Sequence, residues 1–252
     1  MTPATYSPIS VDCVVFGFDG NLLKVLLVPR RFKEAGSDGR LVERQDCKLP
    51  GSLIFDDEDL TQSAYRILGE IIDTNNIYLK QLHVFSNPDR IDSRSMEWLN
   101  ETYRVEARRI VTVAYYSLVK LTPKMAALCE ANHGEWHDVQ SIRKLALDHK
   151  SILMRALETL NKQLVNEPIA FELLPRRFTI RQLQMLYEAI LGVEVDNRNF
   201  RKKLLSSGYL EALDEKEHGV AHKPARFYQF NKSRFEREAR RKTKLNFINW
   251  QG

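Results

Sequence analysis

Hydrophobic and polar positions follow two different patterns along the chain, and the pattern changes near residue 167. In the first region, apolar runs on either side of Asp19, Gly20 and Asn21 predict a β-hairpin, because this triplet is a strong hairpin-turn signal. Apolar, β-branched and aromatic stretches predict further strands. They lie at about residues 45–49, 77–86, 108–121 and 135–139.

Helical periodicity interrupts these strands twice. Residues 59–73 carry apolar side chains at helical spacing, and residues 151–164 predict a second helix that closes the region. Strands around a central helix, with another helix at the end, indicate an α+β fold with an α/β/α sandwich. The charged segment at about 87–107 is expected to form a lid or a mobile loop.

Beyond Asn166, Glu167 and Pro168 the pattern becomes helical and basic, and a proline at this point disfavours a continuing helix. We therefore predict two domains, residues 1–167 and 168–252. Within the second, Thr179 with Gln182 three positions later forms a capping box for a helix that stops at Gly192.

Asp196 caps a second, basic helix that ends at Gly208, and "KPARFYQF" alternates as a strand after a charged loop. The order of helix, turn, basic helix and hairpin is typical of a winged helix-turn-helix.

Charge separates the same two regions. Residues 168–252 hold 17 lysines and arginines against 10 acidic residues, a net charge of +7, whereas the remainder carries −2. This asymmetry favours an anionic partner, nucleic acid or a membrane surface, for the C-terminal region. A solvated basic surface is the alternative. The longest apolar run, residues 110–119, is too short to span a membrane, and the first ten residues lack a secretion signal. We therefore expect a cytoplasmic protein without a membrane partner.

Cysteines and histidines do not form a recognisable metal motif. Cys13, Cys47 and Cys129 are widely separated and lack a C-x-x-C pair, so we interpret them as reduced packing residues. His133 with His137, and His218 with His222, have four-residue spacing, but Gly134 interrupts one pair and the other falls in a loop. No metal site is predicted.

The stretch "KLPGSLIFDDEDLTQSAYRILGEIIDT" resembles a degenerate Nudix box. Gly51, Glu58 and Arg66 match the pattern G-x5-E-x7-R-E-U-x-E-E-x-G-U, with the first gap one residue longer. Where that family has three glutamates after the arginine, this chain has Ile67, Glu70 and Ile71. Active members use those carboxylates to hold magnesium against a diphosphate, and isoleucine cannot coordinate magnesium. We therefore predict no catalytic residues, and interpret both isoleucines as a packing stripe.

The C-terminal pattern is similar to the winged-helix domain of Nudix-related bacterial transcriptional regulators of the NrtR and AraR types. This resemblance implies a homodimer that binds double-stranded operator DNA. It also implies a Nudix-like domain that senses a small molecule, either a pentose such as L-arabinose or ADP-ribose, without a cofactor. Regulation of sugar or NAD-related metabolism would follow.

Two sets of residues are candidates for these roles. Amide, guanidinium and ammonium groups on the basic helix can pair with base edges and phosphates, and flanking residues can meet the DNA backbone. The DNA-binding candidates are Thr179, Arg181, Asn197, Arg198, Asn199, Arg201, Lys202, Lys203, Lys223 and Arg226. The effector candidates, from strand ends around the Nudix-like cleft, are Arg30, Phe32, Arg90 and Tyr115.

Two other hypotheses remain open from the sequence. Glu58, Arg66 and Glu70 could belong to an active Nudix hydrolase of the ADP-ribose pyrophosphatase type that carries a DNA-binding appendage. Alternatively, the winged helix could bind a protein rather than DNA, in which case binding would be insensitive to salt.

Overall fold

The computed structural model describes residues 8–35, 40–75, 77–220 and 223–240, and the chain divides into two compact units. The first unit comprises residues 1–17 and 24–156, and the second comprises residues 18–23 and 157–252. The domain boundary at residue 167 stays a prediction. The α+β class expected from the pattern is confirmed.

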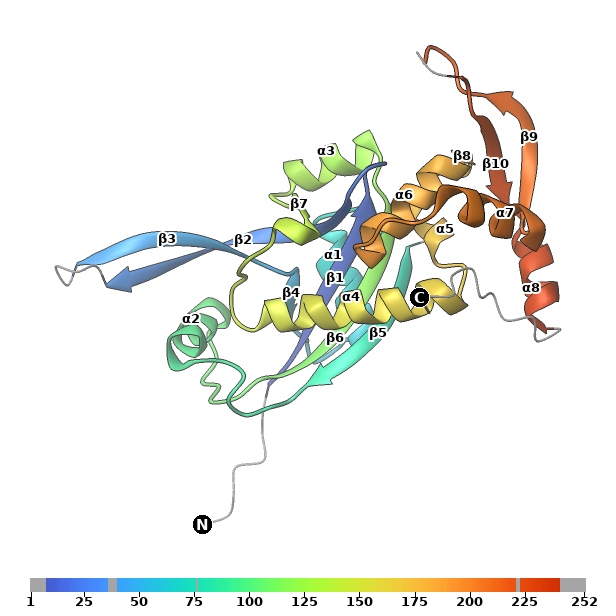
Figure 1. The fold of residues 1–252 in the computed structure, drawn as a ribbon. Coiled ribbons are helices and arrows are strands. Elements are labelled where there is room, and N and C mark those ends of the chain that lie inside the picture. Colours follow the sequence, from blue (N-terminus) through green and yellow to red (C-terminus); the bar gives the residue numbers. More distant parts are fainter. Residues whose placement is uncertain (1–7, 36–39, 76, 221–222, 241–252) are drawn as a thin grey trace. The chain divides into compact units, whose positions relative to one another are not determined.

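A seven-stranded sheet forms the first unit, with the order β3-β2-β1-β6-β5; β4 pairs with β1, and β7 pairs with β2 (Figure 1). Its strands are β1 (Ile9–Phe18), β2 (Leu23–Ala35), β3 (Leu41–Lys48), β4 (Gly51–Leu53), β5 (Tyr78–Phe85), β6 (Val111–Lys120) and β7 (Glu135–Asp138). The predicted hairpin turn is present, since the Asp19 carboxylate accepts hydrogen bonds from the Asn21 and Leu22 amides, at 2.9 and 2.8 Å. The strand expected at 45–49 begins earlier, at Leu41, because β3 pairs with β2 along its whole length.

Helix α1 (Leu60–Gly69) packs on one face of this sheet. Asp59 caps it through a capping box with Gln62. The helix ends at Gly69, four residues earlier than the sequence pattern predicts, because the backbone turns at Glu70 and Ile71. Ile67 and Ile71 are 3% and 7% exposed and belong to the core cluster with Val11, Cys13 and Val15 of β1. Both isoleucines are thus packing residues, as predicted, although Ile71 lies beyond the end of α1 and not on the helix itself.

The opposite face of the sheet carries the alternate residues of β1 and β6, including Asp12 and Thr112. There the N-terminal turn of α4 (His149–Asn166) approaches the sheet, because His149 lies beside Asp12. Helix α4 is two residues longer at each end than the sequence pattern predicts.

The segment at 87–107 is not a loop throughout, because it contains α2 (Ser93–Tyr103), whose N-cap Asp92 accepts a hydrogen bond from the Ser95 amide. The expectation that the segment acts as a lid stays a prediction. Leu99 of this helix is buried with Ala107 and Ile110. Leu53 and Leu147, from outside the segment, pack against these residues, so contacts with the rest of the first unit stabilise the helix.

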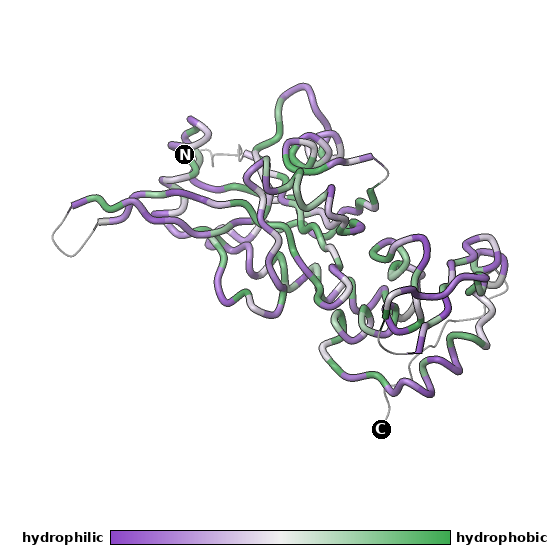
Figure 2. The backbone as a smooth tube through the Cα atoms, turned by 90° about the horizontal axis from the view of Figure 1, so that it is seen from above, coloured by the Kyte–Doolittle hydropathy of each residue, from purple (hydrophilic) through white to green (hydrophobic). Residues whose placement is uncertain are grey.

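Two short elements complete the first unit. Helix α3 (Pro123–Ala131) was not predicted, although Thr122 as N-cap followed by proline at the first helical position is a recognised start signal. A single 3₁₀ turn, η1 (Val139–Ser141), follows β7. Beyond the sheet, β2 and β3 continue as a two-stranded ribbon that is coloured mainly hydrophilic in Figure 2.

The second unit contains the predicted order of helix, basic helix and hairpin, as α6 (Ile180–Leu191), α7 (Asn197–Ser207), β9 (Leu210–Lys216) and β10 (Arg226–Phe230). It also contains α5 (Ala170–Leu173), β8 (Phe178–Thr179) and α8 (Lys232–Arg240), which the prediction did not include. The capping box of Thr179 and Gln182, the N-cap at Asp196 and the left-handed glycines at 192 and 208 are all confirmed. Strands β8, β10 and β9 form a small antiparallel sheet in that order. Residues 241–252 of the basic tail lie outside the described residues, as does His222.

An aromatic cluster holds this winged helix together. Phe171 stacks on Phe230 with ring centroids 4.0 Å apart, and Tyr187 meets Phe200 of α7 edge to face at 5.3 Å. Phe200 therefore fixes the basic helix against α6. Among the described residues, no helix is long and apolar enough to cross a membrane.

Candidate functional site

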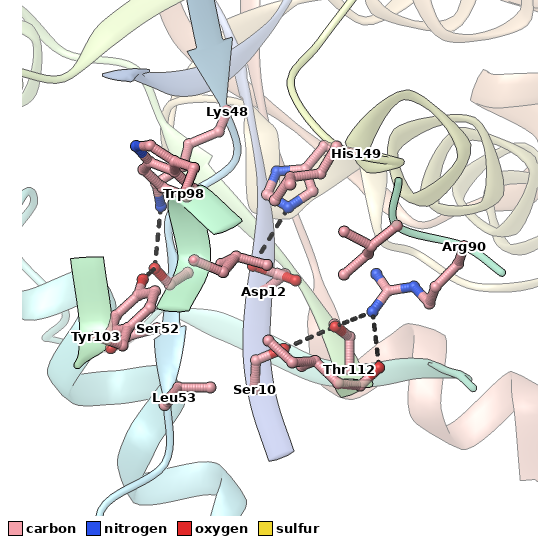
Figure 3. A pocket seen from close by; sticks show the side chains of 15 residues that line it. Ser10, Asp12, Lys48, Ser52, Leu53, Arg90, Trp98, Tyr103, Thr112 and His149 are labelled. Carbon is pink, nitrogen blue, oxygen red and sulfur yellow. Dashed lines mark hydrogen bonds and ion pairs between the residues drawn. The ribbon is translucent and has the colours of Figure 1, made fainter. Parts of the chain in front are cut away.

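A polar cavity lies on the sheet face opposite α1. It is lined by polar residues from three strands and one helix: Ser10 and Asp12 of β1, Lys48 at the end of β3, Thr112 of β6 and His149 of α4 (Figure 3). These residues are separated by up to 139 positions in sequence, and the sheet brings them to one place. A buried set of charged and polar groups of this kind is a common feature of binding sites.

Asp12 is the most deeply placed acid in the cavity. Burial raises the pKa of its carboxyl group, against the opposing effects of Lys48 and Arg90. The glycine of the box, Gly51, leaves space for the Asp12 side chain, because a Cβ atom at this position would lie 1.8 Å from an Asp12 carboxylate oxygen. Lys48 donates to the Gly51 carbonyl at 3.0 Å, and burial lowers the pKa of its ammonium group. The start of the box thus shapes this cavity.

His149 is neutral in this environment. Burial, followed by the charge of Lys48, lowers its pKa to about 3. Its Nδ1 accepts a hydrogen bond from the Leu49 amide at 2.9 Å, so the proton resides on Nε2. Nε2 faces an Asp12 carboxylate oxygen at 3.7 Å, the contact dashed in Figure 3. An Nε2–H donor and a carboxylate acceptor therefore both border the cavity.

Arg90 closes another side. Its guanidinium forms a bidentate pair with Asp148, at 2.8 and 2.6 Å, and donates to the Thr112 hydroxyl at 2.6 Å. The Thr112 hydroxyl in turn meets Ser10 Oγ at 2.7 Å. Since Arg90 was an effector candidate from sequence, its position at the cavity is consistent with that prediction.

Helix α2 covers the cavity with Trp98, Leu99 and Tyr103, and the Tyr103 hydroxyl donates to the Gly51 carbonyl at 3.1 Å. A wider groove adjoins it between α2 and the β2–β3 ribbon, and Trp98 lines both spaces. In the groove, the Arg30 guanidinium lies 4.7 Å from the Phe32 ring centroid and 4.9 Å from that of Trp98. Arg30 also pairs with Asp46 through two hydrogen bonds, of 2.8 and 2.7 Å.

The four effector candidates are therefore not all together. Arg30 and Phe32 line the groove and Arg90 lines the cavity, whereas Tyr115 is 5% exposed within the core cluster beside α1. Sequence reasoning did not select Asp12, Lys48 or His149. A charged residue inside the apolar run "VDCVVFGF" was the one local signal available, and it pointed to Asp12.

The retained box residues form a structural pair. Arg66 binds the Glu58 carboxylate through two hydrogen bonds, of 2.8 and 2.6 Å, and lies over the Phe55 ring at 3.9 Å. These hydrogen bonds from Arg66 lower the pKa of Glu58 to about 2. Arg66 also donates to the Leu53 carbonyl at 3.2 Å, which fastens the loop before α1 to the helix.

Magnesium is the ion that a Nudix box implies, and the residues present do not fit it. Ile67 and Ile71 are core residues, both Glu58 oxygens are engaged by hydrogen bonds, and the Glu70 side chain is 67% exposed. Magnesium requires several oxygen ligands in octahedral geometry. Among the described residues, α1 contributes to no group of three ligand side chains close enough to share an ion.

A second candidate surface is the cationic groove of the winged helix. It is lined by Arg181 of α6, by Asn197 and Arg201 of α7, and by Lys223 and Arg226 of the wing. All five are DNA-binding candidates from sequence, and the fold brings them together. Thr179, in contrast, is 2% exposed and serves as the N-cap of α6, where its side chain accepts from the Gln182 amide.

Helix α7 presents its other candidates to solvent. Phe200 and Leu204 are buried, at 4% and 3% exposure. Helical geometry places Arg198 and Lys202 on the side opposite these two, and both are exposed. Asn199 and Lys203 are exposed as well. An α-helix fits into the major groove of B-DNA, so α7 can present these cations and amides to the base edges.

Known proteins resemble both units. Residues 170–230 match the family model described as the NrtR DNA-binding winged helix domain. The ADPR responsive transcriptional repressor NtrR of Acinetobacter baylyi is 28% identical over 226 residues, which cover 88% of this chain and 81% of that protein.

Solved structures extend the likeness to the fold. Shewanella oneidensis NrtR matches with a TM-score of 0.64 and 25% identity, covering 89% of this chain and 94% of that one. In complex with a 27mer DNA it matches with a TM-score of 0.65 and 24% identity, over 90% and 95% of the two chains. A MutT/nudix family protein from Enterococcus faecalis matches with a TM-score of 0.58 and 25% identity, over 90% and 88%.

The chain therefore has a Nudix-like fold followed by a winged-helix domain, and residues 170–230 of that domain match the NrtR model. The resemblance to Nudix-related transcriptional regulators, first indicated by the box and the basic helix, is confirmed.

Proposed function

We propose that this chain is a ligand-responsive transcriptional regulator that binds operator DNA through residues 168–252. The observation that carries the proposal is the cationic groove of Arg181, Arg201, Lys223 and Arg226 within a domain that matches a DNA-binding winged helix. Exposed Arg198 and Lys202 on α7 would read base edges, while the groove residues would meet phosphates. The NtrR relative bears the name of a transcriptional repressor, which supports this class.

We also propose that the chain acts as a homodimer, since winged-helix regulators commonly read two half-sites about one helical turn apart. The test is the mass of the free protein and of its DNA complex by light scattering. Two chains per duplex would support the proposal. One chain per duplex at saturating protein would overturn it.

For the effector, the first unit favours a nucleotide-like anion over a free pentose. Lys48 and Arg90 supply cations at the cavity, and Phe32 and Trp98 supply aromatic faces in the adjoining groove. A pentose carries no charge that would pair with these cations, whereas ADP-ribose has a diphosphate for the cations and an adenine for the aromatic faces. The name of the NtrR relative, ADPR responsive, points the same way.

Binding would require α2 to move. The cavity has room for little more than a water molecule, so a ligand of this size must displace Trp98 or Tyr103. We propose that the ligand is bound without hydrolysis, because α1 lacks the carboxylates that magnesium needs.

The test combines both units in one experiment. Full-length protein is titrated into fluorescent duplex from the region upstream of its own gene, with ADP-ribose, NAD or L-arabinose present. We expect specific binding that changes with ADP-ribose alone, while chromatography shows the ligand intact after incubation with magnesium. Binding that does not weaken with salt would overturn DNA recognition, and magnesium-dependent cleavage of ADP-ribose would favour the hydrolase hypothesis.

A further inference from the structure

Three side chains outside both candidate sites have the composition of a transition-metal centre. Cys47 Sγ, a Glu135 carboxylate oxygen and a His137 ring nitrogen all lie within 4.8 Å of one another. We propose that these residues bind a divalent transition metal, for which zinc is the best chemical fit. Thiolate, imidazole and carboxylate are the three protein ligand types that zinc uses.

Sheet register explains why these residues meet. Cys47 of β3 lies opposite Pro29 of β2, while Glu135 and His137 of β7 lie opposite Leu27 and Val25. Residues directly opposite each other point to the same face of a sheet, and positions 25, 27 and 29 of one strand share a face. All three ligands therefore emerge on one face, from two strands that pair consecutively with the same edge of β2.

The electrostatic environment favours a cation. Burial raises the pKa of the Cys47 thiol, and the negative charges of Glu135 and Asp46 raise it further. The same negative field attracts a divalent ion, which would displace the thiol proton on binding. His137 Nε2 lies 2.9 Å from a Glu135 oxygen, so the nitrogen and the oxygen already converge.

Solvent can reach the centre, because the His137 and Glu135 side chains are 35% and 50% exposed. Three protein ligands leave a tetrahedral ion one position for water or another ligand. The ion would also join β3 to β7 at the base of the ribbon. Lys48, the next residue after Cys47, lines the effector cavity, so metal binding would fix the strand that positions it.

The three residues are distinct from the Nudix box. None belongs to α1, and their nitrogen and sulfur ligands suit zinc rather than magnesium. The centre also differs from the pairing of His133 with His137 considered from sequence spacing. His133 precedes the glycine at 134, has a left-handed backbone with φ of 61°, and is not a member of the group.

The experiment uses metal-free full-length protein. Zinc affinity is measured by competition with a chromophoric chelator, and cobalt is added separately to look for thiolate-to-cobalt charge transfer and tetrahedral d–d bands. We expect one ion per chain and both spectral features. Cys47→Ser should abolish the charge-transfer band, and Cys47→Ser and His137→Ala should each weaken zinc binding at least about tenfold, since loss of even an outer partner costs about 10–100-fold.

His133→Ala and Cys129→Ala are the matched controls, and both should keep the affinity and the spectrum of the parent. Circular dichroism of each variant establishes that the fold is retained, and Glu135→Gln provides an independent ligand change if Cys47→Ser does not fold. Equal zinc affinity in the parent, Cys47→Ser and His137→Ala would overturn the proposal. A loss of affinity in His133→Ala equal to that in His137→Ala would overturn it as well.

Discussion

The two units place their ionisable side chains in opposite ways. In the first, Asp12, Lys48 and the neutral His149 are withdrawn from solvent into a cavity between a sheet and two helices. In the second, Arg198, Lys202 and their neighbours stand on the exposed side of α7. Buried charges cost free energy unless they gain partners, whereas exposed charges on a helix cost little and can meet a polyanion. The difference indicates a small ligand for one unit and a long anionic surface for the other.

A second contrast exists within the first unit. The face of the sheet that contacts α1 is apolar, and Ile67 and Ile71 belong to its core. The opposite face carries the polar side chains that line the cavity. Two of the three carboxylate positions of the Nudix pattern therefore hold core isoleucines. In the proposed function, the ligand binds on the opposite face of the sheet.

Restoring the box tests this contrast most severely. Ile67→Glu and Ile71→Glu would each put a carboxylate into the apolar core, and an unpaired buried charge costs about 3–5 kcal/mol. We expect each variant to unfold at much lower denaturant concentration, or not to fold, and the double variant to gain no magnesium-dependent hydrolysis. Chemical denaturation followed by circular dichroism measures the change.

Glu70→Gln serves as the control for these variants, because its side chain is largely exposed and its ion pair with Arg66 spans 3.7 Å. Its effect should stay within about 0.5 kcal/mol. A stable double variant that cleaves ADP-ribose would show that the box helix is a site rather than a core element.

Helix α7, which we propose reads the DNA bases, gives the next largest expected effect. Arg198→Ala and Lys202→Ala should each weaken operator binding by about 1–3 kcal/mol where the side chain contacts a base, and by less, with a shallower salt dependence, where it contacts a phosphate. Lys124→Ala, an exposed cation on α3, is the matched control. Fluorescence anisotropy at several salt concentrations distinguishes the two contact types. Unchanged binding by both variants would remove α7 from the interface.

The contrast between units also explains what sequence could predict. The ends of α6 and α7 are determined by neighbours within a few residues, Thr179 with Gln182, Asp196, and the two glycines, so pattern alone located them. The cationic groove followed, because each of its members belongs to a motif with a known order.

The polar cavity could not be found in this way. Leu49 and His149 are 100 positions apart, yet the Leu49 amide donates to His149 Nδ1. Only the completed sheet brings them together.

Helix α2 was missed for a different reason: its charged composition suggested a loop, while burial of Leu99 with Ala107 and Ile110 supplied the stabilisation that composition did not reveal.

The Glu58–Arg66 pair tests whether these box residues stabilise the fold of the first unit. Glu58→Gln should destabilise the first unit by about 1–3 kcal/mol, because hydrogen bonds to charged groups contribute more than neutral ones. The carboxyl pKa is lowered to about 2, so this stabilisation is present above about pH 4.5 and is lost as pH falls towards 2. Between pH 4.5 and 2, the difference in unfolding free energy between the parent and Glu58→Gln should therefore decrease. A constant difference from pH 5 to 2.5 would contradict the assignment.

The smallest expected effect concerns the neutral histidine of the cavity. His149 has a pKa of about 3 in the folded chain against 6.5 for a free imidazole, so the unfolded chain binds a proton first as pH falls. Its contribution to stability is present above about pH 6.5 and declines below it, by about 1 kcal/mol between pH 7 and 5.5. The raised pKa of Asp12 acts in the opposite sense, because protonation of a buried carboxylate stabilises the folded chain.

The difference between the parent and His149→Gln isolates the imidazole, since both proteins keep Asp12. Urea denaturation at half-unit steps of pH measures it, and glutamine can still accept a hydrogen bond from the Leu49 amide. The parent should lose more stability than the variant on acidification. Equal pH dependence in the two proteins would mean that the imidazole is as easily protonated in the folded chain as in water, and the cavity would then be open to solvent rather than closed by α2.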